Sequence, residues 1–88
     1  MAIKRVKVTV TKKNCLFGIP QNISGCPIAL ALKKKGFKNI AVDEDQILVS
    51  KKGEYFTSKV VKAARRFIER FDEGLSVKPF SFNLTLKP

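Results

Sequence analysis

The sequence predicts a small α+β domain, and three observations support this class. Alternating apolar and polar residues mark both ends of the chain, two segments carry apolar residues at helical spacing, and short β-branched runs lie between those two segments. The expected order is β-α-β-β-(β)-α-β. This order predicts an antiparallel or mixed sheet of four to five strands with two helices on one face, similar in plan to a ferredoxin-like fold.

One domain covering residues 1–88 is expected, because a chain of 88 residues supports a single hydrophobic core. Hydrophobic residues make up 44% of the chain, which is too many for a disordered, highly charged polypeptide. No apolar run approaches the ~18 residues of a membrane-spanning helix, and the N-terminal segment lacks the apolar stretch of a signal peptide. These features predict a cytoplasmic protein that does not contact a membrane.

The first strand is expected in Ile3–Thr11, where valines alternate with charged and hydroxyl residues. Residues 12–25 are rich in Gly, Pro, Asn and Ser, which predicts a long loop. Four apolar side chains are expected to fasten this loop to the core: Leu16, Phe17, Ile19 and Ile23.

The first helix is expected to begin at Pro27, because proline at the first helical position loses no hydrogen bond. Ser24 or Cys26 can cap it. It runs to Lys35, and Gly36 fits a left-handed cap at its C-terminal end.

The middle of the chain predicts a β-meander. Ile40–Val42 and Ile47–Val49 are expected to form two strands joined by the acidic turn Asp43–Asp45. A second turn at Lys51–Gly53 then leads to a short strand at Tyr55–Phe56.

The second helix is expected from Ser58 to Asp72, with Thr57 or Ser58 as its cap and Gly74 marking its end. Its apolar residues recur at helical spacing and predict one buried face. A final strand, Phe80–Leu86, follows a linker and alternates apolar with uncharged polar residues.

The charge of the chain indicates a polyanionic or acidic partner. Eighteen Lys and Arg residues stand against seven Asp and Glu, a net charge of +11. Cations on the outward face of the first strand and on the second helix form two rows that could follow a phosphate backbone. The candidate nucleic-acid-binding residues are Arg5, Lys7, Lys59, Lys62, Arg66 and Arg70.

A solvated basic face is the alternative explanation, because the phenylalanines of the second helix and the last strand fall on predicted core faces. Few exposed rings then remain for base stacking. The aromatic residues left as candidates for stacking are Phe17, Tyr55 and Phe56.

Catalytic and metal-binding patterns are absent from the sequence. The chain has no histidine, so neither a zinc site nor a Cys-His nucleophile can be assembled. Cys26 at a helix N-terminus is expected to have a lowered thiol pKa, although a buried or capping role is favoured over a catalytic one. Asp43–Asp45 is better explained as a polar turn than as a cation site. We expect no enzymatic activity, no metal and no cofactor.

Two segments resemble small uncharacterised bacteriophage proteins. The first is CPIALAL at Cys26–Leu32, and the second is the pattern FIxxFDxG…VxPFxF between Phe67 and Phe82. The resemblance covers roughly Asn14 to Leu86. It implies a phage gene product that works in the bacterial cytoplasm, and it brings no assigned activity. Small phage proteins of this kind often act by binding and redirecting a host macromolecule.

Two functions remain open at this point. The first is a non-enzymatic protein that engages DNA or RNA through its cationic surface. The alternative is a phage effector that docks on an acidic surface of a host or viral protein, using the loop around Leu16 and Phe17 or an exposed sheet edge. Exposed sheet edges also leave a homodimer open.

Overall fold

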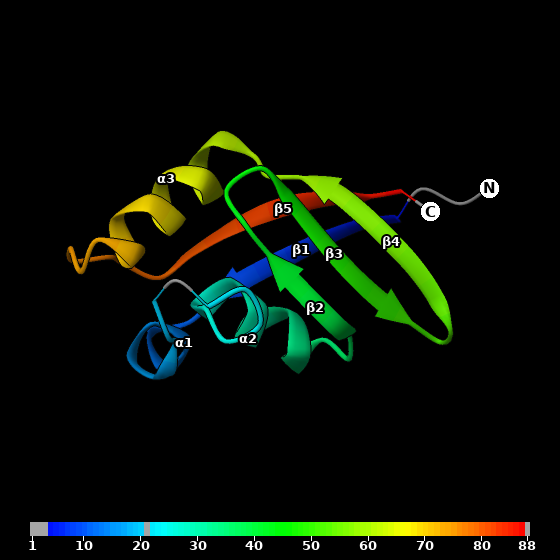
Figure 1. Ribbon diagram of the computed structural model, residues 1–88, viewed down its shortest axis with the longest axis horizontal. Coiled ribbons are helices and arrows are strands. Elements are labelled where there is room, and N and C mark those ends of the chain that lie inside the picture. Colours follow the sequence, from blue (N-terminus) through cyan, green and yellow to red (C-terminus); the bar gives the residue numbers. More distant parts are fainter. Residues whose placement is uncertain (1–3, 21, 88) are drawn as a thin grey trace.

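The computed structural model describes residues 4–20 and 22–87 and has the predicted α+β architecture (Figure 1). The order of the predicted strands and helices is confirmed, and a short helix is added after the first strand. The elements of the described residues are β1 (Lys4–Val10), α1 (Lys12–Phe17), α2 (Pro27–Lys34), β2 (Lys38–Val42), β3 (Gln46–Lys51), β4 (Glu54–Lys59), α3 (Lys62–Asp72) and β5 (Phe80–Leu86).

The five strands form two antiparallel sheets in place of one continuous sheet. β1 and β5 pair along their whole length, from Lys4↔Leu86 to Val10↔Phe80, and β2, β3 and β4 form a meander. The sheets meet at one bridge, where Thr57 and Lys87 exchange backbone hydrogen bonds of 2.7 and 2.8 Å. The β1–β5 ribbon crosses the meander in Figure 1. Apart from this bridge, the described residues of β4 and β5 form no ladder with each other, so the two sheets stay separate.

Alternation along the strands gives each sheet an apolar inner face and a polar outer face. The inner face and the two longer helices share one core, and Phe67 of α3 packs with its ring centroid 4.7 Å from that of Phe80 in β5. Both predicted helices therefore cover the same face. The largest fully buried side chains are Phe56, Ile28, Leu32, Ile47, Leu84, Leu86, Val8, Val10, Val49 and Pro27.

The ends of α2 follow the sequence prediction. Cys26 is the N-cap, and its Sγ accepts a hydrogen bond from the Ala29 backbone N–H at 3.4 Å. Gly36 follows the helix with φ 93°, a left-handed conformation that suits glycine. Gly18 lies against the start of the same helix, where a Cβ would come within 2.6 Å of the Pro27 ring. Only glycine fits this close approach.

The segment predicted as a loop begins with a helix. Thr11 and Asn14 form a reciprocal capping box, in which the Thr11 hydroxyl accepts from Asn14 N–H and the Asn14 side chain accepts from Thr11 N–H. This cap offsets the unfavourable placement of two lysines at the helix N-terminus.

The prediction that apolar residues fasten this segment to the core is wrong for all four side chains. Leu16 and Phe17 are 70% and 68% exposed, and Ile19 and Ile23 are also exposed. Instead, Gly18 lies against Pro27 of α2, Cys15 packs partly on the core, and the Ile23 carbonyl accepts a hydrogen bond of 2.7 Å from the Val42 backbone N–H in β2.

The start of the second predicted helix also needs correction. Thr57 and Ser58 belong to β4, where they pair with Leu48 and Ile47, and α3 begins only at Lys62. Its N-cap is Val61, which makes no side-chain cap hydrogen bond. Ladder pairing next to a full strand outweighs the local preference of a serine for a helix cap. The predicted end is confirmed, since α3 stops at Asp72 and Gly74 has φ 77°.

Among the described residues, no helix combines the length and the apolar composition that crossing a bilayer would require.

Candidate nucleic-acid interface

Three of the predicted cations form a row on α3. Lys62, Arg66 and Arg70 follow one another at four-residue spacing, so they share one face of the helix. Successive members rise by about 6 Å along the helix axis. The buried residues of the helix, Ala64, Phe67 and Ile68, pack toward the core and so fix the orientation of the row.

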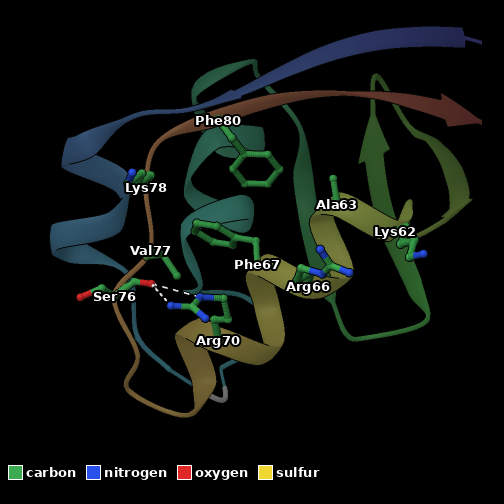
Figure 2. A pocket seen from close by; sticks show the side chains of 9 residues that line it. All are labelled: Lys62, Ala63, Arg66, Phe67, Arg70, Ser76, Val77, Lys78 and Phe80. Atoms are coloured by element: carbon green, nitrogen blue, oxygen red, sulfur yellow. Dashed lines mark hydrogen bonds between the residues drawn. The ribbon is translucent and has the colours of Figure 1, made fainter.

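The row lines a hollow of about 720 Å³ that we call the α3 pocket (Figure 2). Lys78 adds a fourth cation from the segment that returns to β5, and no Asp or Glu lines the pocket. Phe67 and Phe80 form its apolar floor, and in Figure 2 they lie between α3 and the strands. The α3 pocket is thus an open, apolar-floored depression with positive walls.

Hydrogen bonds hold Arg70 in the wall of this pocket. Its Nε and Nη2 both donate to the Ser76 backbone carbonyl, at 3.2 and 3.0 Å. These bonds use two of the five N–H donors of the guanidinium, so three remain for a ligand. They also tie the end of α3 to the segment that carries Lys78.

Arg65 differs from its neighbour Arg66 in having acidic partners. Its Nη2 lies 2.7 Å from Asp45 Oδ1, and its Nε lies 3.7 Å from Glu69 Oε1. No ion pair joins Lys62, Arg66 or Lys78 to an acidic residue in the described chain. The charge on the pocket side of α3 is therefore uncompensated at close range.

Lys59 lies in a second hollow of about 710 Å³, the junction pocket, where the two sheets meet. Thr57 and Lys59 of β4 and Thr85 of β5 line it, together with Val61, the residue before α3. Asp45 also lines this pocket, but its carboxylate is paired with Arg65.

Arg5 and Lys7 lie exposed on the outer face of the β1–β5 ribbon. They pair with Thr85 and Asn83, and neither strand contains an acidic residue. Because Phe80 belongs to the inner face, Arg5 and Lys7 point away from α3. Arg5 and Lys62 do not line the junction pocket, but a neighbour of each does: Thr85 is the cross-strand partner of Arg5, and Val61 directly precedes Lys62.

The structure thus brings Lys62, Arg66 and Arg70 together in the α3 pocket, and it places Lys59 in the junction pocket. Arg5 and Lys7 lie apart from both, on the outer face of the ribbon. Sequence reasoning missed Lys78 and Lys87, which line the α3 pocket and the junction pocket. The sequence could have indicated both lysines as candidate binding residues. All seven acidic residues lie between positions 43 and 73, so the cations outside that range have no acidic neighbour in the sequence.

The aromatic side chains predicted as candidates for base stacking differ in their exposure to solvent. Phe56 is 2% exposed and belongs to the core, so it is corrected from a stacking residue to a packing residue. Phe17 and Tyr55 are 68% and 69% exposed. Phe80 and Phe71 are only partly buried, whereas Phe67 and Phe82 are buried as expected.

The cysteines have structural environments. Both are free thiols, and burial raises the pKa of the Cys26 thiol above its ordinary value. Backbone hydrogen bonds at the helix N-terminus act in the opposite direction but less strongly. The expectation of a lowered pKa is therefore wrong, because loss of solvation outweighs the helix terminus.

The acidic turn is organised by its own hydrogen bonds. Asp43 Oδ1 accepts from the backbone N–H groups of Asp45 and Gln46 at 2.8 and 2.7 Å, and Asp45 is paired with Arg65. Within the described residues, no three Cys, Asp or Glu side chains are placed to hold a metal ion.

Comparisons of the chain with models of protein families, with curated proteins and with solved structures found no match.

Proposed function

We propose that this protein binds nucleic acid without catalysis, through the α3 pocket and the junction pocket. The bound phosphates contact Lys59, Lys62, Arg66 and Arg70, and a longer ligand reaches Arg5 and Lys7 on the ribbon. The observation that carries the proposal is the row of unpaired cations on α3, in a pocket that no acidic side chain lines.

The spacing of the row supports this assignment. A DNA strand carries one phosphate per ~3.4 Å of helix axis, and successive cations on α3 rise by about 6 Å. Each cation can therefore meet a different phosphate. The phenylalanine floor adds an apolar surface next to these charges, where a sugar or a base edge can pack.

The test compares two neighbouring arginines on the same helix. Arg66→Gln and Arg65→Gln change the net charge equally, but only Arg66 faces the α3 pocket. Fluorescence anisotropy with labelled DNA and RNA oligonucleotides should show weaker binding by Arg66→Gln, with the slope of log K against log[salt] reduced by about one. Arg65→Gln should lose less affinity than Arg66→Gln, because Arg65 does not line the α3 pocket; its smaller loss comes from Asp45, which the substitution leaves without its ion pair at the junction pocket.

Equal effects of the two substitutions would show that only total charge matters, and no binding at low ionic strength would overturn the proposal. Melting curves followed by circular dichroism confirm that both variants are folded.

The second candidate is the effector that docks on an acidic surface of a host or viral protein. The exposure of Leu16 and Phe17 favours it, since adjacent large apolar side chains rarely stand free without a partner, and Lys12 and Lys13 precede them on α1. A partner captured from nuclease-treated lysate by wild type, and lost with Leu16→Ser and Phe17→Ser, would support this role. A bacterial cytoplasmic setting and a phage origin belong to both candidates as proposals.

A further inference from the structure

Tyr55 is a large aromatic side chain left uncovered on the outer face of the meander. It follows the β3–β4 turn, pairs with Ser50 across the ladder and is 69% exposed. Leu48 on the same face is 43% exposed. The helices pack on the inner face, so the face that carries Tyr55 is open to a ligand.

A hollow of about 520 Å³, the Tyr55 pocket, lies beside this ring. Lys38, Lys51 and Lys52 line it, and no acidic side chain does. The five strands contain a single acidic residue, Glu54, and alternation places it on the face opposite to Tyr55. All charged side chains that line the pocket beside the ring are therefore positive.

Internal hydrogen bonds fix the floor and wall of the Tyr55 pocket. The buried Ser50 hydroxyl accepts from Asn39 Nδ2 at 2.8 Å and donates to the Lys38 carbonyl at 3.1 Å. Lys51 Nζ donates to the Lys35 carbonyl at 3.2 Å and lies 4.9 Å from the centre of the Phe37 ring. A preorganised wall loses less entropy when a ligand binds.

The turn beside the pocket keeps a lysine where the backbone disfavours one. Lys52 and Gly53 have φ of 52° and 79°, the pattern of a type I′ hairpin turn, in which Asn, Asp or Gly is usual at both positions. Strain of this kind is often found at functional sites. Here it holds a cation at the rim of the Tyr55 pocket.

We propose that the Tyr55 pocket binds single-stranded nucleic acid, with a base stacked on the Tyr55 ring and phosphates on Lys38 and Lys52. This inference rests on the proposed function and makes it specific. An exposed ring flanked by cations fits an unpaired base next to its phosphates, whereas a duplex keeps its bases stacked internally.

The outer face of β4 connects this site with the first one. Tyr55, Thr57 and Lys59 share that face, and Lys59 lies about 13 Å along the strand from Tyr55. Figure 1 shows α3 and the β3–β4 turn at opposite ends of the molecule, with β4 running between them. A single strand stacked on Tyr55 can therefore continue along β4 to the junction pocket and α3.

The chain offers its own reporter for this site. Tyr55 is the only tyrosine and there is no tryptophan, so tyrosine fluorescence comes from the Tyr55 pocket alone. We expect a dT oligonucleotide to quench this fluorescence in a saturable way, and a blunt duplex of the same length to quench it much less. A free tyrosine amide, titrated in parallel, corrects for absorption by the oligonucleotide.

Substitutions then distinguish the contribution of the Tyr55 ring to binding from that of the nearby positive charge. Tyr55→Ser should weaken dT binding by about 5- to 150-fold, whereas Tyr55→Phe, which keeps the ring, should bind as wild type. Lys52→Asn removes the charge while keeping a residue suited to the left-handed turn, and it should reduce the salt slope by about one.

The outcomes distinguish this inference from the proposed function. If Tyr55→Ser binds as wild type while Arg66→Gln is impaired, the stacking site is wrong and the proposed function stands. If Tyr55→Ser is impaired while Arg66→Gln is not, the Tyr55 pocket stands and the α3 pocket is wrong. Equal affinity for single strand and duplex, without quenching, overturns the stacking site directly.

Discussion

Cys26 shows how one residue can serve both the backbone and the core. Its sulfur takes the place of the oxygen that usually caps a helix and accepts the Ala29 N–H at 3.4 Å. The side chain is buried against the core, a position that a small, weakly polar group tolerates well. The same burial that suits the core works against reactivity, because only the thiolate is a strong nucleophile.

The raised pKa of the Cys26 thiol predicts a specific dependence on pH. A pKa that is higher in the folded than in the unfolded protein stabilises the fold below the ordinary thiol pKa of about 8.5, and this contribution is lost as pH rises through the folded value. The free energy of unfolding should therefore fall on the alkaline side. Urea titrations of wild type and Cys26→Ser across this range should show a smaller fall in the variant, because the variant lacks the Cys26 thiol.

Thiol labelling checks the same property. Cys15 is less buried than Cys26, so iodoacetamide should modify Cys15 first and Cys26 only after unfolding or at alkaline pH. Rapid labelling of Cys26 at neutral pH in the folded protein would contradict the role assigned to it.

At the scale of elements, α2 and β5 were predictable because local and long-range preferences agree. Proline at the start of α2, glycine after its end and an apolar face all indicate the same helix, and β5 alternates over its whole length. Where the preferences conflict, prediction failed. The hydroxyls of Thr57 and Ser58 suit a helix cap, but both residues pair with β3 and therefore belong to β4.

The sequence prediction missed the helix α1 for a different reason. Its capping box uses asparagine where the usual signature has glutamate or glutamine, and two lysines occupy the end that favours acidic residues. Its two large apolar side chains, Leu16 and Phe17, are exposed, and only Cys15 packs partly against the core, so apolar character did not predict burial. A helix with no buried side chain leaves almost no pattern for sequence analysis to find.

The exposure of α1 predicts small effects of mutation on stability. Leu16→Ser and Phe17→Ser should change the free energy of unfolding by less than about 0.5 kcal/mol, because both side chains are already in solvent. Leu32→Ala, in the fully buried face of α2, should cost about 2–5 kcal/mol. Urea unfolding followed by circular dichroism measures all three. A large loss for the α1 variants would mean that the segment packs on the core after all.

At the scale of the whole molecule, the sequence predicted which residues carry positive charge but not how they are distributed. Helical spacing correctly grouped Lys62, Arg66 and Arg70, and alternation correctly put Arg5 and Lys7 on one face. The placement of Lys59 on the same helix was wrong, because Lys59 pairs with Gln46 at the end of β4. The α3 cations lie on the inner side of the ribbon, whereas Arg5 and Lys7 lie on its outer face. This arrangement depends on how α3 packs against the ribbon. The aromatic contact of Phe67 with Phe80 decides this arrangement, and it joins residues from separate elements.

The acidic and basic residues differ in where they lie and in what they contact. The acidic residues occur in one central part of the chain, where Asp45 and Glu69 pair with Arg65 and Asp43 organises its turn. All charged side chains of the ribbon, the α3 pocket and the Tyr55 pocket are positive, and the junction pocket adds Lys59, Lys87 and the ion-paired Asp45. In our proposal these regions form a binding track between the two ends of the molecule, whose longest extent is 39 Å.

A track of this kind predicts that the contribution of each row depends on the length of the ligand. A short oligonucleotide that fills only the α3 pocket should be insensitive to the double substitution Arg5→Gln and Lys7→Gln, while a longer one should lose affinity and show a salt slope lower by about two. The double substitution Lys33→Gln and Lys34→Gln removes the same charge from the last turn of α2 and serves as the control. Anisotropy titrations over a series of oligonucleotide lengths measure both. Equal losses for the two double variants at every length would show that nucleic acid responds to the overall field of the protein, because a track requires contacts that begin only when the ligand is long enough to pass the junction pocket.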